Sequence, residues 1–170
     1  SQIHEPTEWV SDLVEVGGNE YELEIKAFID EGWYVYSQEI DGDDGPIPTE
    51  FVYYNQEGNY ELIGETLEPL TEPKYDAVWD MFIKTMSDTV TFTQKVKVTN
   101  PDLHAIDSEV TFMVCNDELC LPPETIEFRF VINENAPPAE KTTGKETSEI
   151  DNKNIEEGEQ KSEKRSLWTI

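Results

Sequence analysis

The chain of 170 residues contains two cysteines, Cys115 and Cys120, which are separated by four residues in the segment CNDELCLPPET. Two thiols at this spacing could form a disulfide or take part in thiol–disulfide exchange, in which a thiolate attacks a disulfide sulfur. A disulfide that closes so short a loop stabilises a fold by only about 2 kcal/mol, which favours exchange chemistry. Short-loop structural disulfides also occur in secreted domains, so the spacing alone leaves both interpretations open.

Alternating segments flank the cysteines, at residues 108–114 before them and at residues 126–132 after them. We predict that both are strands, which places the thiols at a hairpin corner where two Cβ atoms can approach to about 4 Å. Pro122 and Pro123 follow the second cysteine and remove two backbone donors. They either stiffen the exit from the cysteine loop or simply end the strand pairing.

The elements before the cysteines also favour strands. The clearest alternation covers residues 20–29, where five apolar residues alternate with charged ones, and residues 90–98 repeat the pattern. Residues 76–86 fit either one face of a helix or a strand. About eight short strands with turns between them, and no convincing helix, predict an all-β fold, an antiparallel β-sandwich. The cysteines lie too close in sequence to bridge two sheets as the disulfide of antibody domains does.

Three segments differ in composition. Residues 1–135 carry nearly all of the aromatic side chains and are expected to form the folded domain. Residues 136–166 are polar and rich in charge, which predicts a disordered linker. Residues 167–170 are more apolar and include Trp168, so they could begin a membrane helix or simply be the end of the chain. No signal peptide is visible at Ser1, which a mature exported chain would also lack.

The formal net charge is −26, and residues 1–135 carry 30 of the 38 acidic but only 6 of the 12 basic residues. The folded domain therefore carries most of the net negative charge. Its electrostatic field repels nucleic acid and anionic membrane and favours basic partners. A well-solvated surface is the simpler interpretation of the same charge. The acidic loop at residues 41–48 lacks the ligand pattern and flanking helices of an EF-hand, so we predict no metal site.

The run VTFMVCNDELCLPPETIEF resembles the active-site hairpin of the periplasmic N-terminal domain of DsbD-type thiol:disulfide interchange proteins. The stretch IDEGWYVYSQEI resembles a strand of the same family, and the acidic loop is similar to that of its Bacteroidetes-like members. The resemblance covers roughly residues 9–134. It implies an immunoglobulin-like β-sandwich that is the periplasmic domain of an inner-membrane protein, with the membrane reached only through a segment that follows this chain.

The same resemblance implies a protein-disulfide reductase activity, with no cofactor beyond the two thiols. Cys120 would form transient mixed disulfides with thioredoxin-like partners, and Cys115 would resolve them. The partners implied are disulfide isomerases and the proteins of cytochrome c maturation, with electrons supplied by a membrane or thioredoxin-like donor. Residues expected to flank or shield the pair are Tyr34, Tyr36, Asp76 and Trp79. The alternative is a secreted β-sandwich that binds a protein and carries a structural disulfide.

Overall fold

The computed structural model describes residues 4–40, 42 and 44–138, and its regular elements are twelve strands. Residues 139–166 of the linker predicted at residues 136–166 lie outside the described residues, as do the apolar segment at residues 167–170 and Asp41 and Asp43 of the acidic loop. Residues 136–138, which the composition assigned to the linker, are described, and Ala136 is buried.

The first layer is a four-stranded antiparallel sheet in the order β1-β2-β9-β5. Its strands are β1 (Thr7–Gly17), β2 (Glu20–Ile29), β9 (Thr89–Val98) and β5 (Tyr60–Leu67). The alternation in β2 and β9 turns one set of side chains into the core, including Ile25 and Phe92, and leaves the other set toward solvent. Gly17 and Gly18 both have positive φ angles at the tight turn between β1 and β2, a conformation that glycine adopts without steric cost.

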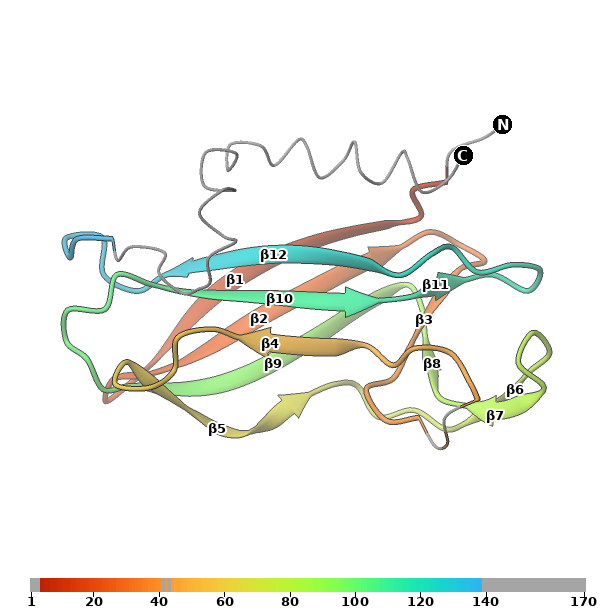
Figure 1. Ribbon diagram of the computed structural model, residues 1–170, viewed down its shortest axis with the longest axis horizontal. Helices are drawn as coiled ribbons and strands as arrows, with labels where there is room; N and C mark the ends of the chain where they lie inside the picture. Colours follow the sequence, from red (N-terminus) through yellow and green to blue (C-terminus); the bar gives the residue numbers. More distant parts are fainter. Residues whose placement is uncertain (1–3, 41, 43, 139–170) are drawn as a thin grey trace.

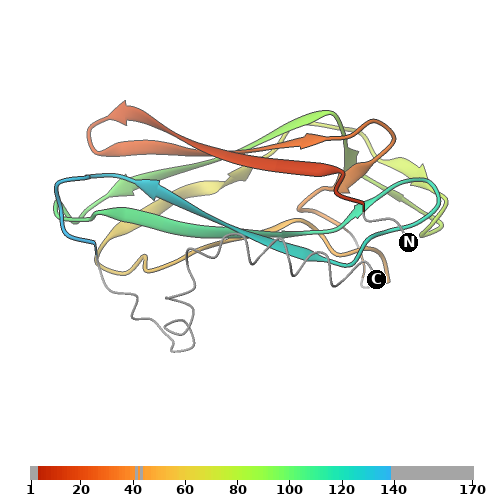
Figure 2. The same cartoon turned by 90° about the horizontal axis from the view of Figure 1, so that it is seen from above.

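The second layer is a three-stranded sheet in the order β12-β10-β4. It consists of β12 (Glu124–Val131), β10 (Ala105–Phe112) and β4 (Glu50–Tyr53). Figure 2 shows the two layers lying face to face along the length of the molecule. Aromatic rings fill the space between them, since Trp9 lies 4.7 Å from Phe112 and 6.1 Å from Phe92 between ring centroids.

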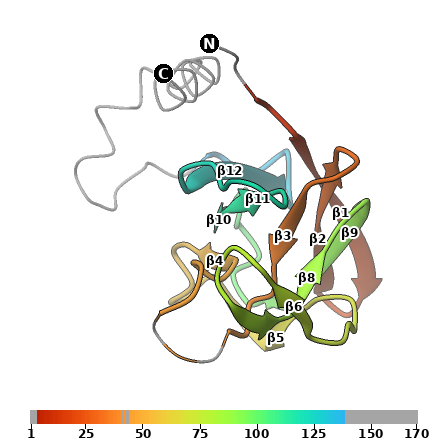
Figure 3. The same cartoon turned by 90° about the vertical axis from the view of Figure 1, so that its right-hand side faces the viewer.

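One end of the sandwich is built differently from the rest, as the right-hand side of Figure 1 shows. There the chain leaves β10, passes Met113 and enters β11 (Val114–Cys115), which pairs with β3 (Tyr34–Tyr36). The other edge of β3 pairs with β8 (Thr85–Met86). A separate hairpin of β6 (Lys74–Asp76) and β7 (Met81–Ile83) lies at the same end (Figure 3).

The prediction of an all-β, immunoglobulin-like sandwich is confirmed, and the described part of the chain contains no helix. Accordingly, no helix that could cross a membrane is found within the described ranges. The segment at residues 76–86, which fitted either a helix or a strand, forms β7, β8 and the loop that leads from β6 into β7.

Candidate functional site

Cys115 and Cys120 form a disulfide with an S–S distance of 1.98 Å and a Cα–Cα distance of 4.0 Å. The two residues oppose each other as an isolated antiparallel bridge at the end of the sandwich. Their surroundings differ, because Cys115 is 0% exposed whereas Cys120 is only partly buried. Of the two cysteines, Cys120 is therefore the one that a second molecule can approach.

Two tyrosines on β3 line the buried side of the disulfide. Tyr34 pairs with Cys115 in the strand register, and its hydroxyl donates a hydrogen bond to the carbonyl of Asn116 at 3.1 Å. Tyr36 is fully buried in one small cluster with Cys115 and Ile83. The two tyrosine rings meet edge to face with centroids 5.7 Å apart. Tyr34 and Tyr36, which the sequence analysis placed next to the cysteine pair, therefore lie beside Cys115.

Asp76 links the buried tyrosine to the β6–β7 hairpin. Its carboxylate is only 5% exposed and accepts a hydrogen bond of 2.9 Å from the Tyr36 hydroxyl. Burial raises the pKa of Tyr36 well above its ordinary value, and the bond to Asp76 raises it further. The phenol therefore stays protonated at neutral pH and remains the donor to the carboxylate.

The loop between β6 and β7 is folded by the same aspartate. The second carboxylate oxygen of Asp76 accepts hydrogen bonds from the backbone N–H groups of Val78 and Trp79 at 2.9 and 3.3 Å. The backbone carbonyl of Asp76 accepts a hydrogen bond from the N–H of Asp80 at 2.7 Å. Asp80 has a positive φ of 54°, a conformation that aspartate tolerates better than most residues. The short sequence DAVWD thus forms a compact turn because an aspartate stands at each end.

This turn places Trp79 against the cluster that contains Cys115. The Trp79 side chain packs on the cluster of Tyr36, Ile83 and Cys115, and Cys120 packs on the same cluster. The indole N–H is buried and has no hydrogen-bond partner among the described residues. The inner face of the hairpin therefore presents an aromatic ring and a carboxylate to the cluster that contains Cys115.

The outer face of the hairpin is apolar and exposed. Tyr75 and Phe82 oppose each other in the register, are 55% and 70% exposed, and have ring centroids 5.6 Å apart. The Tyr75 hydroxyl also bonds to the carboxylate of Asp80. Alternation along the two strands separates these residues from Asp76 and Ile83, which face inward.

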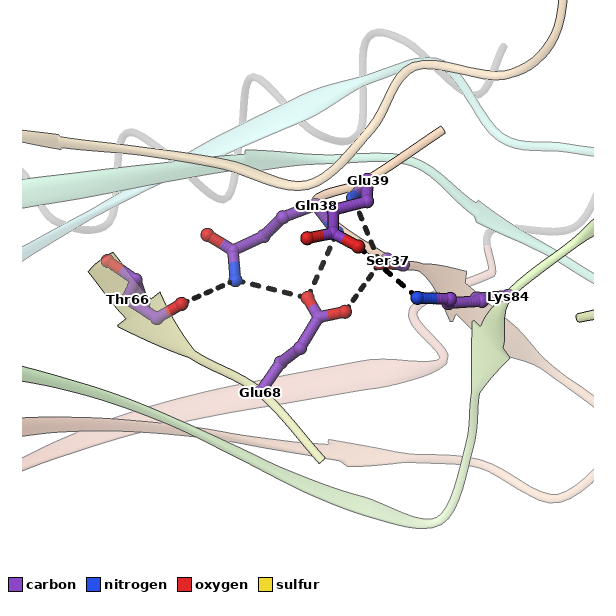
Figure 4. Close-up of polar contacts among 6 residues, drawn as sticks. All are labelled: Ser37, Gln38, Glu39, Thr66, Glu68 and Lys84. Carbon is purple, nitrogen blue, oxygen red and sulfur yellow. Dashed lines mark hydrogen bonds and ion pairs between the residues drawn. The ribbon is translucent and has the colours of Figure 1, made fainter. Parts of the chain in front are cut away.

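The chain that follows Tyr36 is fixed by a polar cluster, shown in Figure 4. Glu68, at the end of the β5 segment, accepts bonds from the Ser37 hydroxyl and from the N–H of Gln38 at 3.0 Å. The Tyr36 carbonyl accepts a bond of 2.6 Å from the Thr49 hydroxyl. Lys84 and Glu39 form an ion pair of 3.2 Å nearby (Figure 4). These contacts hold the end of β3, and with it Tyr36, in one position.

The remaining proposed residues, Pro122 and Pro123, lie between the cysteine bridge and β12, where Pro122 is partly buried and Pro123 is exposed. Side chains that the sequence did not single out complete that cluster: Ile40, Met81, Ile83 and Met113. Only alternation within a very short strand could have indicated that Ile83 faces inward. The acidic loop also approaches the hairpin, because an added Cβ at Gly45 would lie 2.9 Å from the sulfur of Met81.

Three carboxylates lie near the disulfide. Asp117 and Glu118 are exposed in the loop between the cysteines, and Asp76 is buried and bonded to Tyr36, which packs with Cys115. Burial raises the pKa of Tyr34, and the charges of Asp76 and Asp117 raise it further.

Comparison with known proteins gives a family and a fold. Residues 6–132 match a family model described as "Thiol:disulfide interchange protein DsbD, N-terminal". The crystal structure of the N-terminal periplasmic domain of ScsB from Proteus mirabilis is similar, with a TM-score of 0.53 and 13% identity. That match covers 79% of this chain and 49% of the ScsB chain, so this chain spans about half of it. The reduced DsbD N-terminal domain of Neisseria meningitidis matches with a TM-score of 0.49, 16% identity and coverage of 74% and 86%. No curated protein matches the chain.

Proposed function

The chain belongs to the family of N-terminal domains of DsbD thiol:disulfide interchange proteins, and from this membership we propose that it relays electrons through Cys115 and Cys120. It receives them from a membrane-embedded or thioredoxin-like donor. It passes them to periplasmic thioredoxin-like proteins, such as disulfide isomerases and those that serve cytochrome c maturation. Its activity is that of a protein-disulfide reductase, and it acts as a periplasmic domain of an inner-membrane protein.

The exchange itself needs only the two thiols. In the reduced domain the Cys120 thiolate attacks one sulfur of the partner's disulfide, which forms a mixed disulfide and releases the partner's second sulfur as a thiolate. The Cys115 thiolate then attacks the Cys120 sulfur, closes the Cys115–Cys120 disulfide and releases the partner's first sulfur. Two electrons have passed to the partner, which takes up two protons to become a dithiol.

The observation that carries this proposal is the unequal burial of the two cysteines. Cys115 is enclosed by Tyr36 and Ile83, whereas Cys120 is only partly buried. A partner can reach the sulfur of Cys120, and the sulfur of Cys115 is held where it can attack Cys120 from within. This asymmetry supports the division of roles in which Cys120 forms the mixed disulfide and Cys115 resolves it.

The surroundings of the pair suit a carrier that must keep its electrons for its partners. Trp79 covers the cluster from the hairpin, and Asp76, Asp117 and Glu118 disfavour a thiolate. We assign Trp79 as the shielding ring and Asp76 as the acid that anchors the turn around it. Tyr34 and Tyr36 support the pair from β3. Displacement of the hairpin by a docking partner would expose Cys120 and begin the exchange.

Trapping tests the proposal. Cys115→Ser, reduced and mixed with a thioredoxin-like protein that keeps only its exposed active-site cysteine, activated as a mixed disulfide with thionitrobenzoate, should accumulate a mixed disulfide through Cys120 and release thionitrobenzoate, because neither protein then holds a resolving thiol. Cys120→Ser is the matched control and should accumulate little, since its remaining thiol is buried. A non-reducing gel and mass spectrometry of the linked peptides identify the bond.

A measurement of potential separates the redox role from a structural disulfide. A relay pair should equilibrate within the physiological range, whereas a structural disulfide should have a potential below about −300 mV. A wild-type disulfide that resists reduction until the domain unfolds, together with no trapped complex in Cys115→Ser, would refute the relay and favour the binding module with a structural disulfide.

A further inference from the structure

The loop between the two cysteines is closed by hydrogen bonds that do not involve sulfur. The side-chain oxygen of Asn116 accepts from the N–H groups of Glu118 and Leu119, both at 2.8 Å. The N–H of Asn116 donates to the carbonyl of Leu119 at 2.9 Å, and the N–H of Leu121 donates to the carbonyl of Val114 at 3.0 Å. The bond from Tyr34 to the Asn116 carbonyl fixes the loop to β3.

Asn116 is therefore the side chain that folds this loop, and it lies directly after the first cysteine of the pair. Asparagine commonly folds a turn in this way, by accepting from backbone N–H groups two and three residues further along the chain. Because none of these bonds involves a sulfur atom, they can also form in the reduced domain, where they would keep the two thiols close together.

We propose that Asn116 is a positioning residue that raises the effective concentration of the two thiols and so makes the pair a stronger reductant. This inference rests on the proposed redox function of Cys115 and Cys120. In the reduced domain, a loop held closed by Asn116 has already lost most of the conformational freedom that disulfide formation removes. Without the Asn116 side chain the reduced loop opens, and closing the disulfide must then order the loop as well.

The same reasoning predicts how the substitution acts on each redox state. In the oxidised domain the disulfide itself holds the loop, so loss of the asparagine removes two hydrogen bonds with no compensating gain in freedom. In the reduced domain the loop gains freedom when the bonds are lost, and this gain offsets part of the loss. Substitution therefore destabilises the oxidised domain more than the reduced one, and the difference equals the change in the reduction equilibrium.

The equilibrium with dithiothreitol measures this change. One dithiothreitol reduces the Cys115–Cys120 disulfide to two thiols and becomes the cyclic disulfide, so that two electrons and two protons pass between the molecules. In mixtures of reduced and oxidised dithiothreitol, Asn116→Ala in the full chain should shift the equilibrium toward the reduced domain. The two lost hydrogen bonds set the size at about tenfold, which corresponds to about 30 mV for this two-electron couple. Alkylation of free thiols followed by mass spectrometry gives the fraction reduced.

Two variants and a control make the result specific. Asn116→Asp keeps the accepting oxygen and should restore the equilibrium to within about twofold of the wild type, because both protonated thiols and the disulfide are neutral. Asn116→Ser can accept a weaker bond and should give an intermediate shift, which preserves the test if the alanine variant does not fold. Asn133→Ala is the control, since Asn133 folds a similar turn by accepting from the N–H of Asn135 at 3.0 Å but follows the end of β12 that lies opposite the cysteine bridge.

The outcomes separate this inference from the proposed function. If folded Asn116→Ala and Asn116→Ser equilibrate like the wild type, or if Asn133→Ala shifts as much, Asn116 does not position the thiols, while the relay stands. Urea unfolding of both redox states gives an independent measurement: equal losses of stability in the oxidised and reduced Asn116→Ala domains would also overturn the inference. If the wild-type disulfide is not reducible in the folded domain, the relay itself is wrong.

Discussion

The hydrogen bond between Tyr36 and Asp76 is expected to fasten the hairpin that packs against the cluster around Cys115. The two residues lie 40 positions apart in sequence, and their side chains form a direct polar link between β3 and the β6–β7 hairpin. In Tyr36→Phe the ring still fills its place beside Cys115, so packing is preserved. Only the donor is lost, which leaves a carboxylate that is 5% exposed with its two backbone donors alone.

The cost follows from the charge and burial of the acceptor. A hydrogen bond to a charged group contributes roughly 1.5–3 kcal/mol, against about 1 kcal/mol for a neutral pair. We therefore expect Tyr36→Phe to lower the free energy of unfolding by about 2 kcal/mol. For a folded region of this size that loss corresponds to a fall in Tm of roughly 7 °C. Because the hairpin is loosened, the reduced variant should also react faster with a small disulfide oxidant.

Urea unfolding and stopped-flow oxidation test both effects. Tyr53→Phe is the matched control, since the Tyr53 hydroxyl bonds to the neutral hydroxyl of Thr66 at 2.8 Å and lies away from the cysteines. That variant should lose about 1 kcal/mol with no change in oxidation rate. A double-mutant cycle with Asp76→Asn should give a coupling energy of about 1–2 kcal/mol. A coupling energy near zero, or an oxidation rate equal to that of Tyr53→Phe, would refute the role of this bond.

Three further expectations follow from the same structure. Trp79→Ala should accelerate oxidation of reduced Cys120 by a small disulfide severalfold, with less effect on a protein partner that displaces the hairpin; an unchanged small-oxidant rate in a folded variant contradicts the shielding role. Reduction of the disulfide should lower Tm by only about 7 °C, because a loop this short contributes about 2 kcal/mol; calorimetry that shows loss of the fold would favour a structural disulfide. Burial raises the pKa of Tyr36, and it raises the pKa of Tyr53 to about 12. These tyrosines should therefore contribute fully to the free energy of unfolding below the ordinary tyrosine pKa of about 10, and this free energy should fall as pH rises above it. Urea unfolding between pH 8 and 11 should show this fall, reduced in Tyr36→Phe, and a flat profile would contradict it.

The strands of the two layers could be predicted because their signal is local. Successive side chains of a strand point to opposite faces, so the alternation of Tyr21, Leu23, Ile25, Ala27 and Ile29 with charged residues indicates a half-buried strand wherever it pairs. Four of these five are buried as expected, and Tyr21 packs at the edge of the core. Residues 90–98 behave in the same way, although Gln94 is a polar residue on the buried face. Its amide is satisfied by Gly64, Thr66 and Lys95, which the sequence did not indicate.

The short elements at the end of the sandwich carry too little signal to be predicted. A strand of two or three residues, such as β6, β7 or β11, shows at most one alternation. The segment DAVWD fitted a helix as well as a strand, and its fold depends on Asp76 accepting from its own turn and from Tyr36 at once.

Composition, spacing and alternation are properties of neighbouring residues, so they were enough to predict one close thiol pair in an acidic all-β domain. The enclosure of Cys115 and the accessibility of Cys120 depend instead on tertiary packing. That difference arises where the chain passes from β10 into β11 and pairs with β3, and where a hairpin some 40 residues earlier in the sequence packs against the pair. Contacts between segments so far apart depend on how the layers pack, which no local pattern specifies.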